Sequence, residues 1–129
     1  MNWRVEQAKD LWQRALDSLA VAGRDLSEGY CDLAASRAYY AAFHAASALL
    51  LVDEKRFAKH SGVIASVHRD YVKEGKLPTD AGKILSSLFY LRNIADYGGT
   101  NHVAPADAQR AVADAQRFLD LVRPLLPLE

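Results

Sequence analysis

The sequence contains one cysteine, Cys31, among its 129 residues. An intramolecular disulfide cannot form, so packing must stabilise the fold, and a reducing cytoplasm is the simplest compartment. Basic and acidic residues balance at sixteen each, which leaves no net charge. A neutral protein has no overall field that draws it to a phosphate backbone, so strong non-specific DNA binding is disfavoured. Any nucleic-acid contact must come from a local patch.

Long hydrophobic runs are also absent. The most apolar stretch, Ala38 to Val52, contains His44 and falls short of the ~20 residues that span a bilayer. The opening residues, MNWRVEQAKD, lack the apolar region of an export signal. The sequence therefore predicts a protein without a membrane segment, and we expect it to be cytoplasmic.

Strand signals and domain linkers are missing as well. No segment alternates apolar and polar residues between turn signals, and no repeat or Pro/Ser/Gly-rich linker divides the chain. Apolar residues instead recur at three- and four-residue steps, which is the period of a helix. We expect a single all-α domain over residues 1–129, and the short turns favour a five-helix up-and-down bundle.

The expected helix bounds follow from glycine stops, polar caps and prolines in the first turn. Gly23 is expected to end the first helix, and Ser27 and Ser61 to cap the second and third. The first three helices are predicted at about Asn2–Ala22, Ser27 (cap) to Val52, and Ser61–Glu74. The fourth follows KLPTD, where Pro78 and Thr79 are start signals, and runs to about Tyr97. The fifth begins at Pro105 and is bent or ended by Pro124.

The second expected helix is apolar nearly all round. Between Leu33 and Val52 its only charged residue is Arg37. Such a helix must be covered on nearly every side, either at the centre of the bundle or by a second subunit as well. We infer a homodimer from this pattern.

The end of the fourth helix, LRNIADYGGTNH (91–102), places polar residues before a double glycine. Helical geometry puts Arg92 beside the apolar stripe and Asp96 one turn later, and a charge there needs a carboxylate, a phosphate or a wet cleft. One interpretation is an i,i+4 ion pair that completes the helix end. In the other, Arg92, Asn93, Asp96 and Tyr97 line a cleft that binds phosphate or performs acid–base chemistry.

A second polar group lies on the apolar helix, where Arg37, Tyr40 and His44 share one stripe. The first interpretation is a satisfied polar layer that sets the register between helices. The second places Arg37 and Tyr40 opposite Arg92, which gives two cations where the phosphates of a nucleotide could sit. The pattern leaves both interpretations open.

The remaining histidines do not form a metal pattern. His60 and His68 are eight residues apart, about 80° from a shared helix face, and no Cys or Glu completes a zinc motif. We expect neither a metal nor a cofactor. The pair His60-Ser61 is interpreted as a helix cap with His60 in the preceding turn, rather than as a catalytic pair.

Four segments carry a resemblance to a known family: SRAYYAAFHAASALL, AKHSGVIASVHRDYVKEGKL, LFYLRNIADYGG and ADAQRAVADAQRFL. In this order they resemble the HEPN domain (higher eukaryotes and prokaryotes nucleotide-binding), in its small free-standing prokaryotic branch. The resemblance covers nearly the whole chain and implies a five-helix bundle that commonly dimerises. It also implies a small nucleotidyltransferase as partner, as in toxin–antitoxin modules.

The resemblance implies a motif as well. Many HEPN proteins resemble metal-independent ribonucleases, in which an arginine is followed four to six residues later by a histidine, in a cleft between two subunits. Arg92 matches the arginine and Asn93 its polar follower, but the window from Tyr97 to Gly99 contains no histidine, and the nearest imidazole beyond it is His102. RNA cleavage needs a group that titrates near neutrality, as imidazole does and phenol normally does not.

The predicted function is therefore binding of nucleotide or RNA in an Arg92-centred dimer cleft, by one component of a two-gene HEPN–nucleotidyltransferase system. The residues expected to bind are Arg92, Asn93, Asp96, Tyr97, Arg37 and Tyr40. One alternative is a metal-independent endoribonuclease that uses Arg92 with His102 or Tyr97. Another is a non-catalytic interaction module.

Overall fold

A computed structural model describes residues 3–55 and 59–128 of the protein. Within these residues it is all-α, as predicted, and no strand is present. A π-helical segment, η1, follows directly on α3, and a 3-10 turn, η2, follows α5. The elements are α1 (Trp3–Ser27), α2 (Cys31–Val52), α3 (His60–Ser66), η1 (Val67–Val72), α4 (Thr79–Tyr97), α5 (Pro105–Val122) and η2 (Arg123–Leu125).

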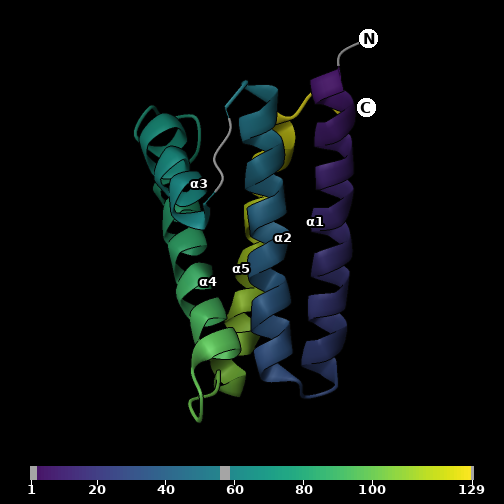
Figure 1. Ribbon diagram of the computed structural model, residues 1–129, viewed down its shortest axis with the longest axis vertical. Coiled ribbons are helices and arrows are strands. Elements are labelled where there is room, and N and C mark those ends of the chain that lie inside the picture. The colour runs from purple at the N-terminus through teal and green to yellow at the C-terminus, as the bar shows by residue number, and fades with distance from the viewer. Residues whose placement is uncertain (1–2, 56–58, 129) are drawn as a thin grey trace.

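The four long helices run alternately up and down (Figure 1). Helix α2 lies in the middle of the bundle and packs against α1, α4 and α5, while the short α3 lies beside the upper part of α4. The predicted five-helix up-and-down bundle is thus confirmed. The apolar character of α2 is accounted for by cover from three helices of its own chain, so the homodimer stays a prediction.

Alanine allows this close packing. Ala8, Ala15 and Ala22 recur every seven residues on α1 and are fully buried, and all the alanines of α2 are buried as well. Small side chains at a contact let two helix axes approach closely, so α1 and α2 pack along their whole length.

The turn between α1 and α2 differs from the prediction. Helix α1 continues through Gly23 and ends at Ser27, whose hydroxyl donates back to the carbonyl of Arg24 at 2.8 Å. The left-handed conformation that follows the end of α1 occurs at Gly29, with φ +85°, and α2 begins at Cys31. Gly23 as a stop and Ser27 as a cap are therefore wrong, because Gly23 lies inside α1, Ser27 is the last residue of α1, and Tyr30 is the N-cap of α2.

The third helical segment also differs from its predicted form. It begins at His60, with Lys59 as N-cap and no cap from a side chain, so the predicted cap by Ser61 is wrong. Its second half is the π-helix η1, in which Asp70 accepts hydrogen bonds from Arg69 and from the buried Ser66. These bonds hold the pKa of Asp70 well below its usual range.

The start and end of α4 and the start of α5 agree with the prediction: α4 spans Thr79–Tyr97, and α5 begins at Pro105. These positions matter for the site, because the end of α4 carries the polar residues. No helix in the described part of the chain is long and apolar enough to cross a bilayer.

Candidate functional site

Arg92 lies on the flank of α4 that faces α2, where its side chain is only 12% exposed. Its Nε atom lies 3.0 Å from Oδ2 of Asp96, so the predicted i,i+4 ion pair is present. The two groups are not aligned for a hydrogen bond, and Nε is buried without a hydrogen-bond partner among the described residues. Asp96 therefore balances the charge of Arg92 without accepting a hydrogen bond from its Nε–H group.

The two terminal nitrogens of Arg92 each make one hydrogen bond. Nη2 donates to the hydroxyl of Tyr40 at 2.7 Å, and Nη1 donates to Oδ1 of Asn93 at 3.3 Å. A guanidinium carries two N–H groups on each terminal nitrogen. Within the described residues, one N–H on each therefore remains free to donate to a ligand.

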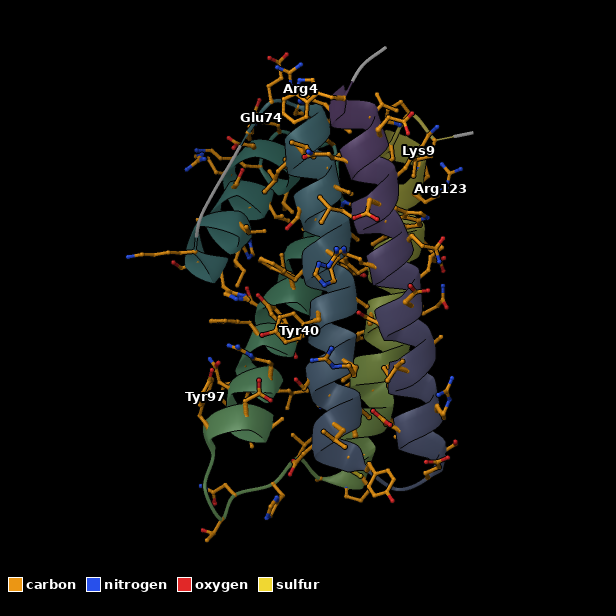
Figure 2. All side chains as sticks on the ribbon, turned by 45° about the vertical axis from the view of Figure 1, so that its right-hand side comes forward. Arg4, Lys9, Tyr40, Glu74, Tyr97 and Arg123 are labelled. Atoms are coloured by element: carbon orange, nitrogen blue, oxygen red, sulfur yellow. The ribbon has the colours of Figure 1, made fainter. Side chains whose placement is uncertain are left out.

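Tyrosine rings surround the guanidinium. Its Cζ atom lies 5.9 Å from the ring centroid of Tyr39, 5.4 Å from that of Tyr40 and 5.2 Å from that of Tyr97. These are cation–π distances. These three rings form a cage around the guanidinium. Tyr39 is fully buried, whereas Tyr97 is 72% exposed, so the cage is closed toward the core and open toward solvent. Figure 2 shows Tyr40 between α2 and α4, and Tyr97 near the lower end of α4.

The surroundings of Arg92 favour its charged form. Burial alone would lower the pKa of Arg92, but Tyr40, Tyr97 and Asp96 outweigh burial and raise it above its ordinary value. For Tyr39, burial has the opposite effect and raises the pKa, so the phenol keeps its proton. The arrangement is a positioned cation beside neutral hydroxyl groups.

The structure brings Arg37 to the same place. Its Cζ atom lies 5.0 Å from the ring centroid of Tyr40, so Arg37 and Arg92 contact one phenol ring. Among the described residues, no carboxylate forms an ion pair with Arg37, which therefore adds positive charge. The ring of His44 lies 6.2 Å from that of Tyr40, and the predicted stripe on α2 is present.

His102 is held elsewhere. Its Nδ1 atom lies 2.6 Å from Oδ2 of Asp32, and the backbone N–H of Val103 donates to Oδ1 of the same carboxylate at 2.8 Å. Burial would raise the pKa of Asp32, but these bonds outweigh it and lower the pKa. Asp32 precedes Tyr40 by eight residues, about 12 Å along a helix. Within one chain, the structure does not bring His102 to Arg92.

Comparison with known protein families matches residues 8–125 to the HEPN domain. The chain belongs to the HEPN family. A UPF0332 protein of Thermotoga maritima is 34% identical over 94% of this chain and 92% of its own length. A UPF0332 protein of Gloeobacter violaceus is 35% identical over 93% of this chain and 96% of its own length. A protein of Methanocaldococcus jannaschii named "Putative toxin MJ0605" is 37% identical over 72% of this chain and 69% of its own length.

In this HEPN chain, one imidazole that the sequence analysis interpreted as part of a helix cap lies against the same tyrosine rings as Arg92. His60, at the start of α3, lies with its Nδ1 atom 2.6 Å from the hydroxyl of Tyr39, and its ring stacks on Phe43 with centroids 4.4 Å apart. Burial and the charge of Arg92 lower the pKa of His60. No local signal places His60 here, because its position depends on how α3 folds back onto α2 and α4.

No three His, Cys, Asp or Glu side chains of the described residues lie close enough together to hold a metal ion. His60 and His68 have separate partners, since Nε2 of His68 lies 3.0 Å from the hydroxyl of Ser86 on α4. The HEPN site described here consists of arginine, tyrosine, amide and carboxylate groups.

Proposed function

We propose that this HEPN protein binds a phosphate group of RNA or of a nucleotide at Arg92. The observation that carries the proposal is the free N–H on each terminal nitrogen of a guanidinium that Tyr40 and Asn93 hold in place. A phosphate accepts two parallel hydrogen bonds from such a fork. Because the guanidinium is already ordered, little side-chain entropy is lost on binding.

Charge and exposure around Arg92 favour the same ligand. Asp96 neutralises one positive charge, but Arg37 adds a second one beside the Tyr40 ring. The ring of Tyr97 is 72% exposed at the open side of the cage. An exposed aromatic ring beside a phosphate-binding cation suits a nucleotide, whose base stacks while its phosphate pairs.

We further propose that the protein works in the cytoplasm as the toxin-type component of a two-gene system, as a homodimer and with a small nucleotidyltransferase as partner. Membership of the HEPN family and the word toxin in the name of the M. jannaschii relative support this role. Light scattering of the purified protein tests the dimer, and co-purification with a nucleotidyltransferase encoded beside it tests the partner.

The decisive experiment is fluorescence anisotropy with labelled single-stranded RNA in the presence of EDTA. A hydrogen bond to a charged group is worth about 1.5–3 kcal/mol, so we expect Arg92→Ala to weaken binding about ten- to a hundredfold. Arg110→Ala is the matched control, because Arg110 is a 63% exposed arginine on α5 that pairs with Asp107. The control should bind within about twofold of wild type. Equal binding by Arg92→Ala and wild type, with both folded by circular dichroism, overturns the proposal.

The same samples separate the other two functions. Cleavage of the RNA by wild type in EDTA, and not by Arg92→Ala, would make the protein a metal-independent ribonuclease. The position of Tyr97 against Arg92 then directs attention to that phenol before His102. If wild type neither binds nor cleaves RNA or nucleotide, the interaction module is the better description.

A further inference from the structure

His60 is packed into an aromatic cluster beside the Arg92 site. Its ring stacks on Phe43, with centroids 4.4 Å apart, and faces Phe89 of α4 at 6.1 Å in a nearly parallel arrangement. Its Nδ1 atom lies 2.6 Å from the hydroxyl of Tyr39. Among the described residues its Nε2 atom has no hydrogen-bond partner. The imidazole is therefore held firmly while one nitrogen stays available.

His60 and Arg92 lie against the same two rings. The centroid of Tyr39 is 5.6 Å from the imidazole centroid and 5.9 Å from Cζ of Arg92. The centroid of Tyr40 is 6.0 Å from the imidazole and 5.4 Å from Cζ. An anion bound by the free N–H groups of Arg92 would consequently lie in the electrostatic field of His60.

Among the residues that the structure describes, the ionisable groups found to contact or act on His60 are Tyr39 and Tyr40 from α2 and Arg92 from α4, and no carboxylate is among them. Burial and the positive charge of Arg92 both disfavour the imidazolium, so His60 is neutral in the free protein at neutral pH.

The hydroxyl of Tyr39 can serve both protonation states. It keeps its proton, because burial raises the pKa of the phenol. It can therefore donate to Nδ1 of a neutral imidazole, or accept from Nδ1–H of an imidazolium. Protonation of His60 thus needs only a rotation of this hydroxyl, and the Tyr39–His60 contact is kept.

We propose that His60 is a second phosphate-sensing group of the Arg92 site, which takes up a proton when a phosphate binds there. This inference rests on the proposed function. A fixed negative charge beside an imidazole stabilises its protonated form, and by thermodynamic linkage protonation then strengthens binding of the anion. Phosphate binding at Arg92 is thereby coupled to pH.

The first test is an NMR titration of the four histidines of the wild-type protein. The probe is a short oligouridylate with 2′-O-methyl groups, which has no free 2′-hydroxyl for cleavage and whose phosphodiesters do not titrate between about pH 5 and 8. We expect saturating probe to raise the pKa of His60 by about one unit, while His68, which contacts Ser86, serves as an internal control and does not shift. An unchanged His60 titration in the presence of bound probe overturns the inference.

The second test measures affinity for the same probe at about pH 5.5 and about pH 8. A one-unit difference corresponds to at most about tenfold tighter binding by wild type at the lower pH, and the full factor is reached once the pH falls below the pKa of His60 in the free protein. His60→Gln should remove this pH dependence, and His68→Gln should keep it. The same pH dependence in His60→Gln as in wild type, with normal melting temperatures, overturns the inference.

The two failures are distinguishable. If wild type binds the probe and Arg92→Ala does not, but His60 does not respond, the phosphate site stands and the coupling to His60 is wrong. If wild type fails to bind the probe at either pH, both the phosphate site and the coupling are wrong.

Discussion

The hydroxyl of Tyr40 on α2 lies 2.7 Å from Nη2 of Arg92 on α4, although the two residues are 52 positions apart in the chain. This bond joins the central helix to the helix that ends in the polar segment. The ring of the same tyrosine contacts Arg37. Tyr40 therefore sets where both cations lie, and its hydroxyl can be removed without removing either charge.

Tyr40→Phe should lower both stability and RNA affinity. The change deletes the oxygen that accepts from Nη2 of Arg92 and leaves a partly buried N–H unpaired, which costs about 1–3 kcal/mol. Urea unfolding followed by circular dichroism measures the cost. Tyr90→Phe is the control, since Tyr90 is 66% exposed, and it should change stability by less than about 0.5 kcal/mol. Equal stability of the two variants would contradict the role given to the Tyr40 hydroxyl.

Two glycine substitutions should differ in how much they stabilise the protein. At Gly82 on α4, a Cβ would come within 2.5 Å of the ring of His68, an exposed side chain that can move aside but contacts Ser86 in its present position. Gly82→Ala should therefore stabilise the protein less than an alanine at an open helical position does. At Gly23, inside α1, a Cβ would meet nothing within 4 Å. Gly23→Ala should therefore stabilise the protein by about 0.5–1 kcal/mol. Thermal unfolding of the two variants measures the difference, and a Gly82→Ala variant at least as stable as Gly23→Ala would contradict the contact between His68 and α4.

Acid should weaken the fold through two histidines. Burial lowers the pKa of His44 and of His60 below the ordinary value of 6.5, helped by Arg14 and Arg37 at His44 and by Arg92 at His60. At a pH between the pKa of each histidine in the folded protein and its pKa in the unfolded chain, the unfolded chain binds more protons than the folded protein. The free energy of unfolding therefore falls as the pH drops below 6.5.

Urea titrations at about pH 7.5 and about pH 5 measure this loss. The variants His44→Gln and His60→Gln should each show a smaller difference between the two pH values than wild type. A difference as large as that of wild type in both variants would assign the acid sensitivity to other groups.

His102→Ala should leave RNA affinity within about twofold of wild type, because Asp32 holds this imidazole about 12 Å along α2 from Tyr40. Anisotropy with the RNA used for Arg92→Ala provides the measurement. A loss as large as that of Arg92→Ala would show that His102 reaches the site, for example from a second subunit.

Local signals predicted some helix boundaries and failed at others. The starts of α4 and α5 were predicted correctly, because Pro78 and Pro105 restrict the backbone whatever surrounds them. The boundaries predicted from Gly23 and Ser27 were wrong, because a single glycine or serine is tolerated inside a helix when packing continues past it. The π-helix of η1 left no pattern in the sequence, since its apolar spacing also fits an ordinary helix.

The sequence by itself determined the all-α class, the apolar faces and the i,i+4 pair of Arg92 with Asp96, because helical periodicity relates residues three or four apart regardless of their surroundings. Only the tertiary structure decided that Tyr40 meets Arg92, that His60 joins them and that His102 pairs with Asp32. Those contacts join segments far apart in the chain. Their geometry depends on how the buried faces of α2, α3 and α4 pack together, which no local spacing encodes.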